Sequence, residues 1–398
     1  MRLDILTEHS EEIEILWSRR RAMLVSPRET LTTLAALERR LGAHIAGLAV
    51  DREGAHDCFA SGLASKDPDA TFAIIATLLR IASLSSRDRA LTAARAERGA
   101  GSRGVTEAFA WMPLDPALEP RLRAALRDED GPMRAFATAV LGAHMALAPS
   151  ERAAAVADAD ARVRMAIAQA AVANGAESAA LTLLAEDELA AVRTAALGAL
   201  AAAGAPDALD RIRSEHAAHR SCELLELLGR IGDDADVTGI REAAREPELA
   251  EVAIRALGAL ATTAAAEALL DCMQEAAIAP AAGEAFWRIT GLEPAERKVA
   301  ASTADDDAGF EETRPMPDFG ATTAWWQKHR AKFASGERWR DGKPLEHARW
   351  LASPHAGDLL TRREELTRLR ASGPGTHPKL ALDAPARRQR ESTEQEVH

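Results

Sequence analysis

The sequence contains no tyrosine, and aromatic residues make up only 4% of its 398 residues. Alanine, the strongest helix former, occupies about 90 positions. β-Sheets are rich in aromatic and β-branched residues, so this composition argues against a β-sandwich, a β-barrel or a dinucleotide-binding α/β fold. We expect an all-α protein with a sizeable core, because 47% of the residues are hydrophobic.

Cysteine is also scarce. Cys58, Cys222 and Cys272 lie far apart and form no CxxC pair, so neither a disulfide framework nor a zinc ribbon is expected. The first residues carry several acids and lack a cationic start followed by an apolar stretch, and no run approaches the roughly 18 apolar residues of a membrane span. We therefore expect a cytoplasmic protein without a cleaved signal.

Positive charge is in the minority. The formal net charge is -12 and the isoelectric point is about 5.5. Nucleic acids and anionic membranes bind proteins largely through their basic residues. The composition predicts neither a nucleic-acid partner nor a membrane partner.

Residues 1–60 are predicted to form a two-helix N-terminal cap. Both helices show apolar residues at helical spacing, and the second follows Ser26-Pro27-Arg28-Glu29, which has the pattern of a capping box. The apolar stripes are Ile13, Leu16, Trp17 and Leu24 in the first helix, and Leu34, Leu37, Leu41, Ile45 and Leu48 in the second.

Residues 61–295 repeat with a period of about 30 residues. Three stretches align without gaps, at 132–137, 162–167 and 191–196, and each follows an acidic cluster. Such a unit is a helix pair that buries its apolar stripe only by stacking on its neighbours, and alanine and glycine let these helices approach closely. The pattern predicts an α-α superhelix, or solenoid, of about eight such units.

The repeated stretch Asp-x-x-[Val/Met]-Arg resembles the signature of HEAT-like repeats, and its short period resembles the lyase-type HEAT repeat. On this pattern the acid caps the second helix of each pair. Arg134, Arg164 and Arg193 recur at one position, and we expect them to form ladders with the preceding acids.

The composition changes after the repeats. Residues 296–319 are acidic, contain proline and are predicted to be a solvated linker. Residues 320–398 are predicted to be a basic, tryptophan-rich unit with a frayed tail. From Arg314 onward there are 16 Lys+Arg and 11 Asp+Glu, net +5, against net -17 for the rest of the chain. This unit either folds back on the acidic repeats or presents a partner surface.

Residues that bear catalytic or metal-binding chemistry form no recognisable motif. The sequence has no HExxH and no GxSxG. His216, His219 and Cys222 fall near one helical face, but one helix does not supply a full tetrahedral set, so we expect two surface histidines and a core cysteine. The prediction is a protein with no catalytic activity, no cofactor and no metal.

Two groups of residues are candidates for partner contact, since tryptophan and arginine are favoured at the centre of protein interfaces. The alternative is that the tryptophans form the small core of the C-terminal unit. The C-terminal group is Trp325, Trp326, Arg338 and Trp339, and the N-terminal group is Trp17, Arg39 and His44.

Several stretches go beyond a generic repeat pattern. They are HSEEIEILW at 9–17, LAALERRLGAHIAGL at 34–48, FWRITG at 286–291, AWW at 324–326 with Phe333, Gly336 and Arg338, and APARRQ at 384–389. In this order they resemble a bacterial family of HEAT-repeat-containing proteins encoded in type VI secretion gene clusters. The resemblance implies an adaptor or chaperone that helps to load an effector onto the secretion spike. Its implied partners are an effector, a PAAR-like tip protein, the spike or a thiolase-like protein.

Two other functions fit the same architecture. One is an enzyme-type HEAT solenoid, either lyase-type or DNA-binding, which a basic concave cleft with a buried acid would favour. The other is a general protein scaffold unrelated to secretion.

Overall fold

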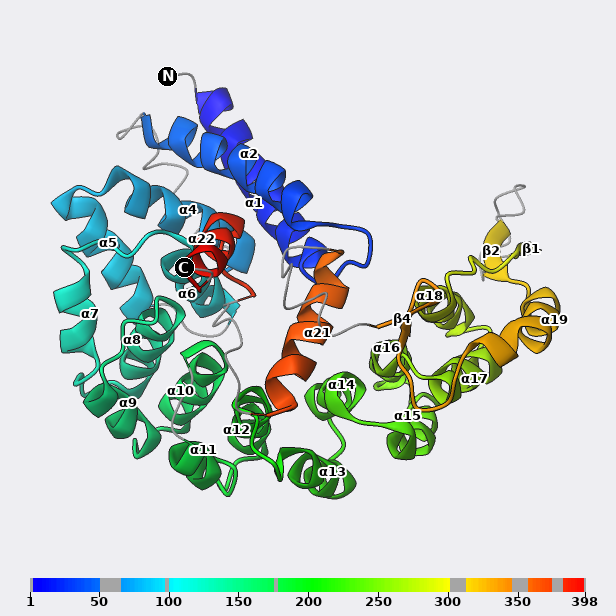
Figure 1. Cartoon of the computed structure of the whole chain (residues 1–398). Helices are drawn as coiled ribbons and strands as arrows, with labels where there is room; N and C mark the ends of the chain where they lie inside the picture. Colours follow the sequence, from blue (N-terminus) through cyan, green and yellow to red (C-terminus); the bar gives the residue numbers. More distant parts are fainter. Residues whose placement is uncertain are drawn as a thin grey trace. The chain divides into compact units, whose positions relative to one another are not determined.

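The structure, a computed structural model, describes residues 3–50, 66–96, 100–174, 178–300, 313–345, 357–373 and 382–396. Within these ranges it contains 20 α-helices and two sheets of two short strands each (Figure 1). Helices account for 71% of the structure, so the expectation of a mostly helical protein is confirmed. None of the helices in these ranges is both long and apolar enough to span a membrane.

Residue contacts divide the chain into two compact units. The first comprises Met1–Ala203, Ser353–Arg363 and Pro374–His398, and the second comprises Gly204–Ala352 and Glu364–Gly373, each as far as it is described. This grouping differs from the expected four-part division at residues 60, 295 and 319. The residues expected to form a separate C-terminal unit belong partly to each compact unit.

The first unit is built from helices. They are α1 (Leu3–Met23), α2 (Leu31–Val50), α4 (Pro68–Ile81), α5 (Leu84–Ala96), α6 (Ala100–Trp111), α7 (Glu119–Ala125), α8 (Gly131–Ala143), α9 (Pro149–Val156), α10 (Ala161–Asn174), α11 (Ser178–Leu184), α12 (Ala190–Ala202), α22 (Ala386–Glu396) and the first five residues of α21 (Leu359–Ala371).

The second unit combines helices with the two small sheets. Its elements are α13 (Ala208–Ala218), α14 (Cys222–Ile231), η1 (Asp234–Asp236), α15 (Val237–Ala243), α16 (Ala250–Leu260), α17 (Thr263–Cys272), α18 (Ala279–Thr290), β1 (Glu296–Ala300), β2 (Thr313–Pro317), α19 (Phe319–His329), η2 (Arg330–Lys332), β3 (Trp339–Arg340), β4 (Lys343–Pro344) and the rest of α21.

Alternate helices pack on one another within each unit. In the first unit α8 packs on α10 and α10 on α12, and in the second α14 packs on α16 and α16 on α18. A Cβ atom on Gly142 of α8 would lie 2.5 Å from the Cβ of Ala170 on α10, and one on Gly229 of α14 would lie 2.6 Å from the Cα of Ala256 on α16. The expected close approach of helices at glycine and alanine is confirmed at both places.

The recurring arginines pair differently from our expectation. Arg134 donates to the carboxylate of Asp158 at 2.7 and 2.8 Å, and Arg164 donates to Asp187 at 2.6 and 3.0 Å. Each of these acids belongs to the acidic cluster that follows the arginine in the sequence, while the preceding cluster gives only main-chain carbonyls, such as that of Asp128 at 2.9 Å. The guanidinium of Arg134 thus contacts both the main chain of the preceding cluster and the carboxylate of the following one. Its planar, forked donors fit the two carboxylate oxygens.

The predicted capping by the acid before the helix is present at one cluster and absent at another. Asp160 accepts from the N–H of Arg162 in the first turn of α10 at 2.9 Å, whereas Asp130, which precedes α8, makes no side-chain cap hydrogen bond. Instead the Oδ1 atom of Asp128 accepts from the N–H of Asp130 at 3.0 Å, and Asp158 does the same for Asp160 at 2.8 Å. Asp128 and Asp158 therefore close the turn before the helix, where each also receives an arginine from another helix.

The second N-terminal helix begins later than the predicted capping box. It starts at Leu31, and the hydroxyl of Thr30 accepts from the N–H of Thr33 at 3.3 Å. The residues before it are held by the chain that enters α21, because Leu359 N–H donates to the carbonyl of Glu29 at 2.7 Å. Thr30 and Thr33 cap the helix in place of the predicted box, since the N–H of Thr30 also donates to the Thr33 hydroxyl at 2.9 Å.

Candidate protein-interaction sites

Two of the predicted contact tryptophans lie in the core of the second unit. Trp326 of α19 is 4% exposed, and its ring lies 5.6 Å from Phe286 of α18 and 5.2 Å from Phe333. Trp339 is also 4% exposed and lies 4.8 Å from Phe333. These aromatic rings hold α19 and the following chain against α18, so Trp326 and Trp339 stabilise the fold and offer no free surface to a partner.

Trp325 differs from its neighbour because it is only half-buried. Its ring stacks on His329 one helical turn later, with centroids 4.4 Å apart and an angle of 20°. The Nδ1 atom of His329 lies 2.8 Å from the Trp325 carbonyl oxygen, which fixes the pair. Lys328 and Arg330 beside it are exposed. Trp325 therefore keeps a surface on which a partner can pack.

Arg338 reaches into the second unit. Its guanidinium donates to the carbonyl of Leu260 at 2.9 Å and to the carbonyl of Gly232. Burial, together with the nearby charge of Arg368, lowers the pKa of Arg338 to about 9. This arginine serves the fold more than a partner.

A buried charge network lies next to Arg338. The Oε2 atom of Glu364 on α21 accepts from Arg288 of α18 at 2.8 Å and from Arg340 at 2.5 Å. Burial alone would raise the pKa of Glu364, but the two guanidinium groups outweigh burial and lower the pKa to about 2. Glu364 is therefore ionised near neutral pH.

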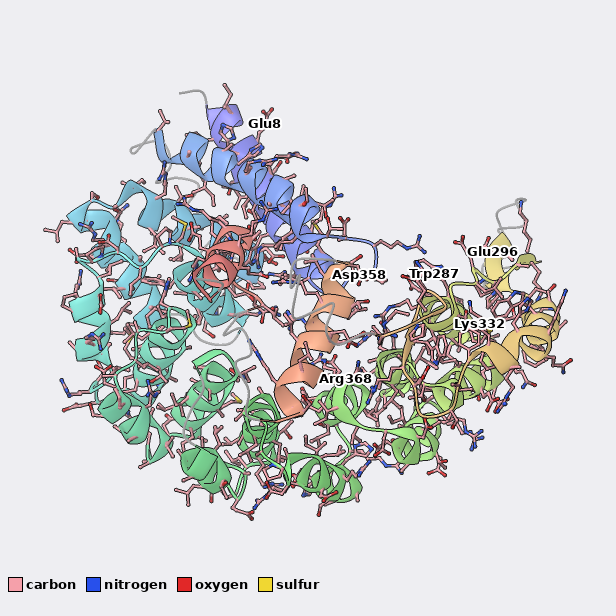
Figure 2. The ribbon with its side chains drawn as sticks, viewed as in Figure 1. Glu8, Trp287, Glu296, Lys332, Asp358 and Arg368 are labelled. Atoms are coloured by element: carbon pink, nitrogen blue, oxygen red, sulfur yellow. The ribbon has the colours of Figure 1, made fainter. Side chains whose placement is uncertain are left out.

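Further arginine contacts cap the carboxyl ends of the helices. Arg340 donates to the carbonyl of Gly258 in α16 at 2.7 Å, and Arg368 donates to those of Ala259 in α16 and Arg230 in α14, both at 2.9 Å. The last carbonyls of a helix have no partner inside the helix and carry its negative dipole end. These side chains satisfy the carbonyls of two neighbouring helices; Figure 2 labels Arg368 on α21.

The main chain completes the same arrangement on α18. The N–H of Asp341 donates to the carbonyl of Arg288 at 3.0 Å, and the N–H of Gly342 donates to that of Ile289 at 3.1 Å. Gly342 has a φ of 68°, a conformation that favours glycine. The segment around β3 therefore runs across the ends of α14, α16 and α18.

The network holds more positive than negative side chains. Glu365 is fully buried, pairs with Arg368 through one oxygen, and leaves the Oε2 atom without a partner among the described residues. The four arginines Arg288, Arg338, Arg340 and Arg368 exceed the two glutamates Glu364 and Glu365. Three helix carboxyl ends, each with roughly half a negative charge, offset this excess.

The N-terminal candidates do not form one site. Trp17 is buried, stacks on Phe72 of α4 at 3.6 Å, and donates from Nε1 to Glu107 of α6 at 2.7 Å. Arg39 is exposed on α2, whereas the Nδ1 atom of His44 lies 3.1 Å from the Nδ1 atom of His9 on α1. Trp17 therefore has a packing role, and only Arg39 and His44 remain accessible on α2.

The end of the chain also caps a helix in the first unit. Arg388 of α22 donates to the carbonyls of Ala110 and Trp111 at 2.6 and 3.0 Å, which are the last of α6. The N–H of Ala386 donates to Glu38 of α2 at 2.8 Å, which places a carboxylate at the amino end of α22. Sequence reasoning missed these roles, although clustered arginines in a polar helix were the available signal.

The histidine and cysteine cluster does not share one helical face. Helix α13 ends at Ala218, so His219 follows it, and Cys222 opens α14. Cys222 is half-buried, and it does not form the expected core residue. Within the described ranges, no group of three or more His, Cys, Asp or Glu side chains is placed to hold a metal ion.

No protein family model matches the chain, and no curated protein matches it either. The resemblance to HEAT-repeat proteins of type VI secretion clusters therefore stays a prediction.

Proposed function

We propose that this protein is a non-catalytic, protein-binding adaptor, built as an α-solenoid of short HEAT-like repeats. The packing of alternate helices, with Gly142 against Ala170 and Gly229 against Ala256, supports a repeated architecture in both units. Such arrays present long surfaces that individual repeats can adapt to a partner.

The observation that carries the proposal is the way in which the second unit binds the segment around β3. The segment around β3 is not helical, and it lies across the ends of three helices through main-chain and guanidinium donors, including Trp339 N–H to the carbonyl of Ala261 at 2.8 Å. Carbonyls at the ends of helices lack partners inside the helix, so they can hold an extended segment of another chain in the same way. We infer that other surfaces of the array bind segments of a partner in a similar way.

The family resemblance gives this adaptor a place and a partner class. It would act in the cytoplasm and help to load a type VI secretion effector onto the spike or its PAAR-like tip. Trp325, with Lys328 beside it, and Arg39 with His44 are the accessible members of the predicted contact groups. We assign partner contact to these residues.

Glu364 does not favour the enzyme-type alternative as a general acid. Glu364 accepts from both Arg288 and Arg340, and its lowered pKa keeps it ionised. A general acid needs a proton to give at neutral pH. This carboxylate therefore serves as a structural anchor.

Co-expression of the full chain with each implied partner tests the proposal. We expect one of the effector, tip, spike or thiolase-like proteins to co-elute with the chain in gel filtration. Trp325→Ala should weaken that complex, and Leu84→Ala, a change at an exposed apolar residue on α5, is the matched control. If none of the four forms a complex, the secretion role is wrong.

A further inference from the structure

The strands β1 and β2 form an antiparallel ribbon whose two sides differ. Pro317 of β2 lies against α18, since a Cβ atom on Gly283 would lie 3.2 Å from the Cβ of Pro317, and Met316 is buried. In β1, by contrast, the side chains of Glu296, Arg297 and Lys298 are exposed. β2 is therefore the inner strand and β1 the outer one. Figure 1 labels both strands, and Figure 2 labels Glu296.

The register shows where the main-chain groups of β1 point. Asp318 N–H donates to the carbonyl of Ala295 at 2.6 Å, so these two residues form a hydrogen-bonded pair. In an antiparallel ladder such pairs alternate with pairs whose N–H and C=O groups point away from each other. Glu296 opposite Pro317, the next pair, is therefore of the outward-pointing kind, as is Lys298 opposite Pro315.

This alternation makes the two edges of the ribbon unequal. On β2 the outward positions 315 and 317 are both proline, which has no N–H to donate, so that edge cannot extend the ladder there. On β1 the outward N–H and C=O groups of Glu296 and Lys298 are intact, and the described part of the chain supplies no strand to pair with them. One edge is blocked and the other is open.

We propose that the outer edge of β1 is a docking site for an extended, acidic segment of a partner protein, which adds to the ribbon as a third strand. An exposed strand edge is a ready template for such addition, and main-chain hydrogen bonds supply the affinity. Arg297 and Lys298 project from opposite faces of the strand, so acidic side chains on both faces of the incoming segment would match them. The inference rests on the proposed adaptor function, since it names that function's surface and partner chemistry.

A second copy of β1 matches this edge less well than an acidic segment. Antiparallel self-pairing centred on Lys298 would place two lysines opposite each other. Self-pairing centred on Arg297 would place two arginines opposite each other, offset by Glu296 opposite Lys298 on either side. Like charges directly opposite in a ladder are destabilising. A partner of opposite charge avoids this cost.

Lys298→Pro tests the edge directly, because it removes one outward N–H while leaving the pairing with β2 in place, as Pro315 does on the other strand. Lys298→Ala is the matched control, since it removes the charge but keeps the N–H. The probe is a fluorescein-labelled eight-residue peptide in which pairs of valine alternate with pairs of glutamate, so that both faces of the added strand carry glutamate, and its binding to the full chain is measured by fluorescence anisotropy. We expect Lys298→Pro to weaken binding of the peptide at least tenfold. Lys298→Ala should also weaken peptide binding, but by a factor several times smaller than that of Lys298→Pro.

A second measurement does not depend on the folding of the variant. The same peptide, N-methylated at alternate residues to remove its main-chain donors, should bind the wild-type chain at least tenfold more weakly than the parent peptide. Equal binding of both peptides, or no binding of either, would overturn the strand-addition proposal. A wild-type dimer that Lys298→Pro converts to a monomer would overturn the choice of occupant in favour of a second copy.

The outcomes also separate this inference from the adaptor function. If an implied partner binds the wild-type chain and Lys298→Pro equally well, the adaptor function stands and the edge proposal fails. If the peptide binds at the edge as described but no partner protein is found, the edge proposal stands and the secretion role fails.

Discussion

Arg340 and Glu364 form an ion pair in the interior of the second unit, with 2.5 Å between Nη2 and Oε2 and side chains only 8% and 3% exposed. Glu364 also accepts from Arg288, and Arg340 also donates to the carbonyl of Gly258. The pair therefore joins α18, β3 and α21 and ties a polar segment to the carboxyl end of α16. The integrity of the second unit should depend on it.

Glu364→Gln should destabilise the protein by about 3–5 kcal/mol, because removing one member of a buried pair leaves the guanidinium groups without their counter-charge. The free energy of unfolding in urea measures this change. Glu337→Gln, at an exposed residue near the same segment, is the control and should stay within about 0.5 kcal/mol of the wild type. Equal stability of the two variants would show that the pair contributes little.

The carboxylate of Glu364 also predicts that the protein loses stability in acid. Its pKa is lowered from 4.5 to about 2, so the ionised form is favoured in the folded state. The resulting stability, about 3 kcal/mol, is present above the unfolded pKa and is lost as the pH falls from about 5 to about 2. The gap in unfolding free energy between the wild type and Glu364→Gln should therefore shrink across this range. A gap that is constant from pH 5 to pH 2 contradicts the assignment.

His9 and His44 predict a second pH dependence, in the first unit. Burial and the charge of His9 lower the pKa of His44, while Glu12 opposes this and Arg40 adds to it. Below about 6.5 the unfolded chain takes up this proton first, so stability falls as the pH drops.

Thermal unfolding at pH 8 and pH 5.5 measures this effect. The wild type should lose more stability between the two pH values than His44→Gln does. His219→Gln, at an exposed histidine, is the control and should behave as the wild type. If His44→Gln shows the full wild-type loss, the histidine pair does not sense pH.

The adjacent tryptophans should separate folding from binding. Trp326→Ala should destabilise the protein by about 3–5 kcal/mol, because it empties a site in the aromatic core. Trp325→Ala, at a half-buried ring, should cost about 1 kcal/mol or less in stability and reduce partner binding. Urea unfolding together with the gel-filtration complex measures both effects. If Trp325→Ala unfolds the chain as Trp326→Ala does, Trp325 is core and its contact role is wrong.

Replacing a glycine by alanine should change the stability in opposite directions at two positions. Gly229→Ala should destabilise by about 1–3 kcal/mol, because its new methyl group would meet Ala256. Gly239→Ala is the matched control on α15, where nothing lies within 4 Å of the new atom, and it should stabilise by up to about 1 kcal/mol. If both variants are stabilised, α14 and α16 are not in close contact.

Helical content and the close helix contacts could be predicted from the sequence, because alanine, glycine and the repeated apolar spacing act locally. The contacts at Gly142 and Gly229 are instances of this general expectation, although neither glycine was singled out from the sequence alone. The partner of Arg134 was not, since the sequence places acids on both sides and only the packed helices show that Asp158 receives the guanidinium.

The C-terminal arginines mark the limit of sequence reasoning. Helix α21 reads LLTRREELTRLRA, a composition typical of a solvated helix, yet Glu364, Glu365 and Arg368 are all buried. Their partners are main-chain carbonyls and charges far away in the sequence, which no local pattern encodes. The strands at 296–300 and 313–317 were missed for a related reason, because proline and charge had indicated a linker.

Affinity purification of the tagged full-length protein from its native host, with mass spectrometry of what stays bound at moderate salt, tests the adaptor function most directly. The account predicts stoichiometric recovery of a secretion effector, tip, spike or thiolase-like protein with the wild type, and reduced recovery with Trp325→Ala. Recovery of nucleic acid, or of no protein in stoichiometric amount, would contradict it.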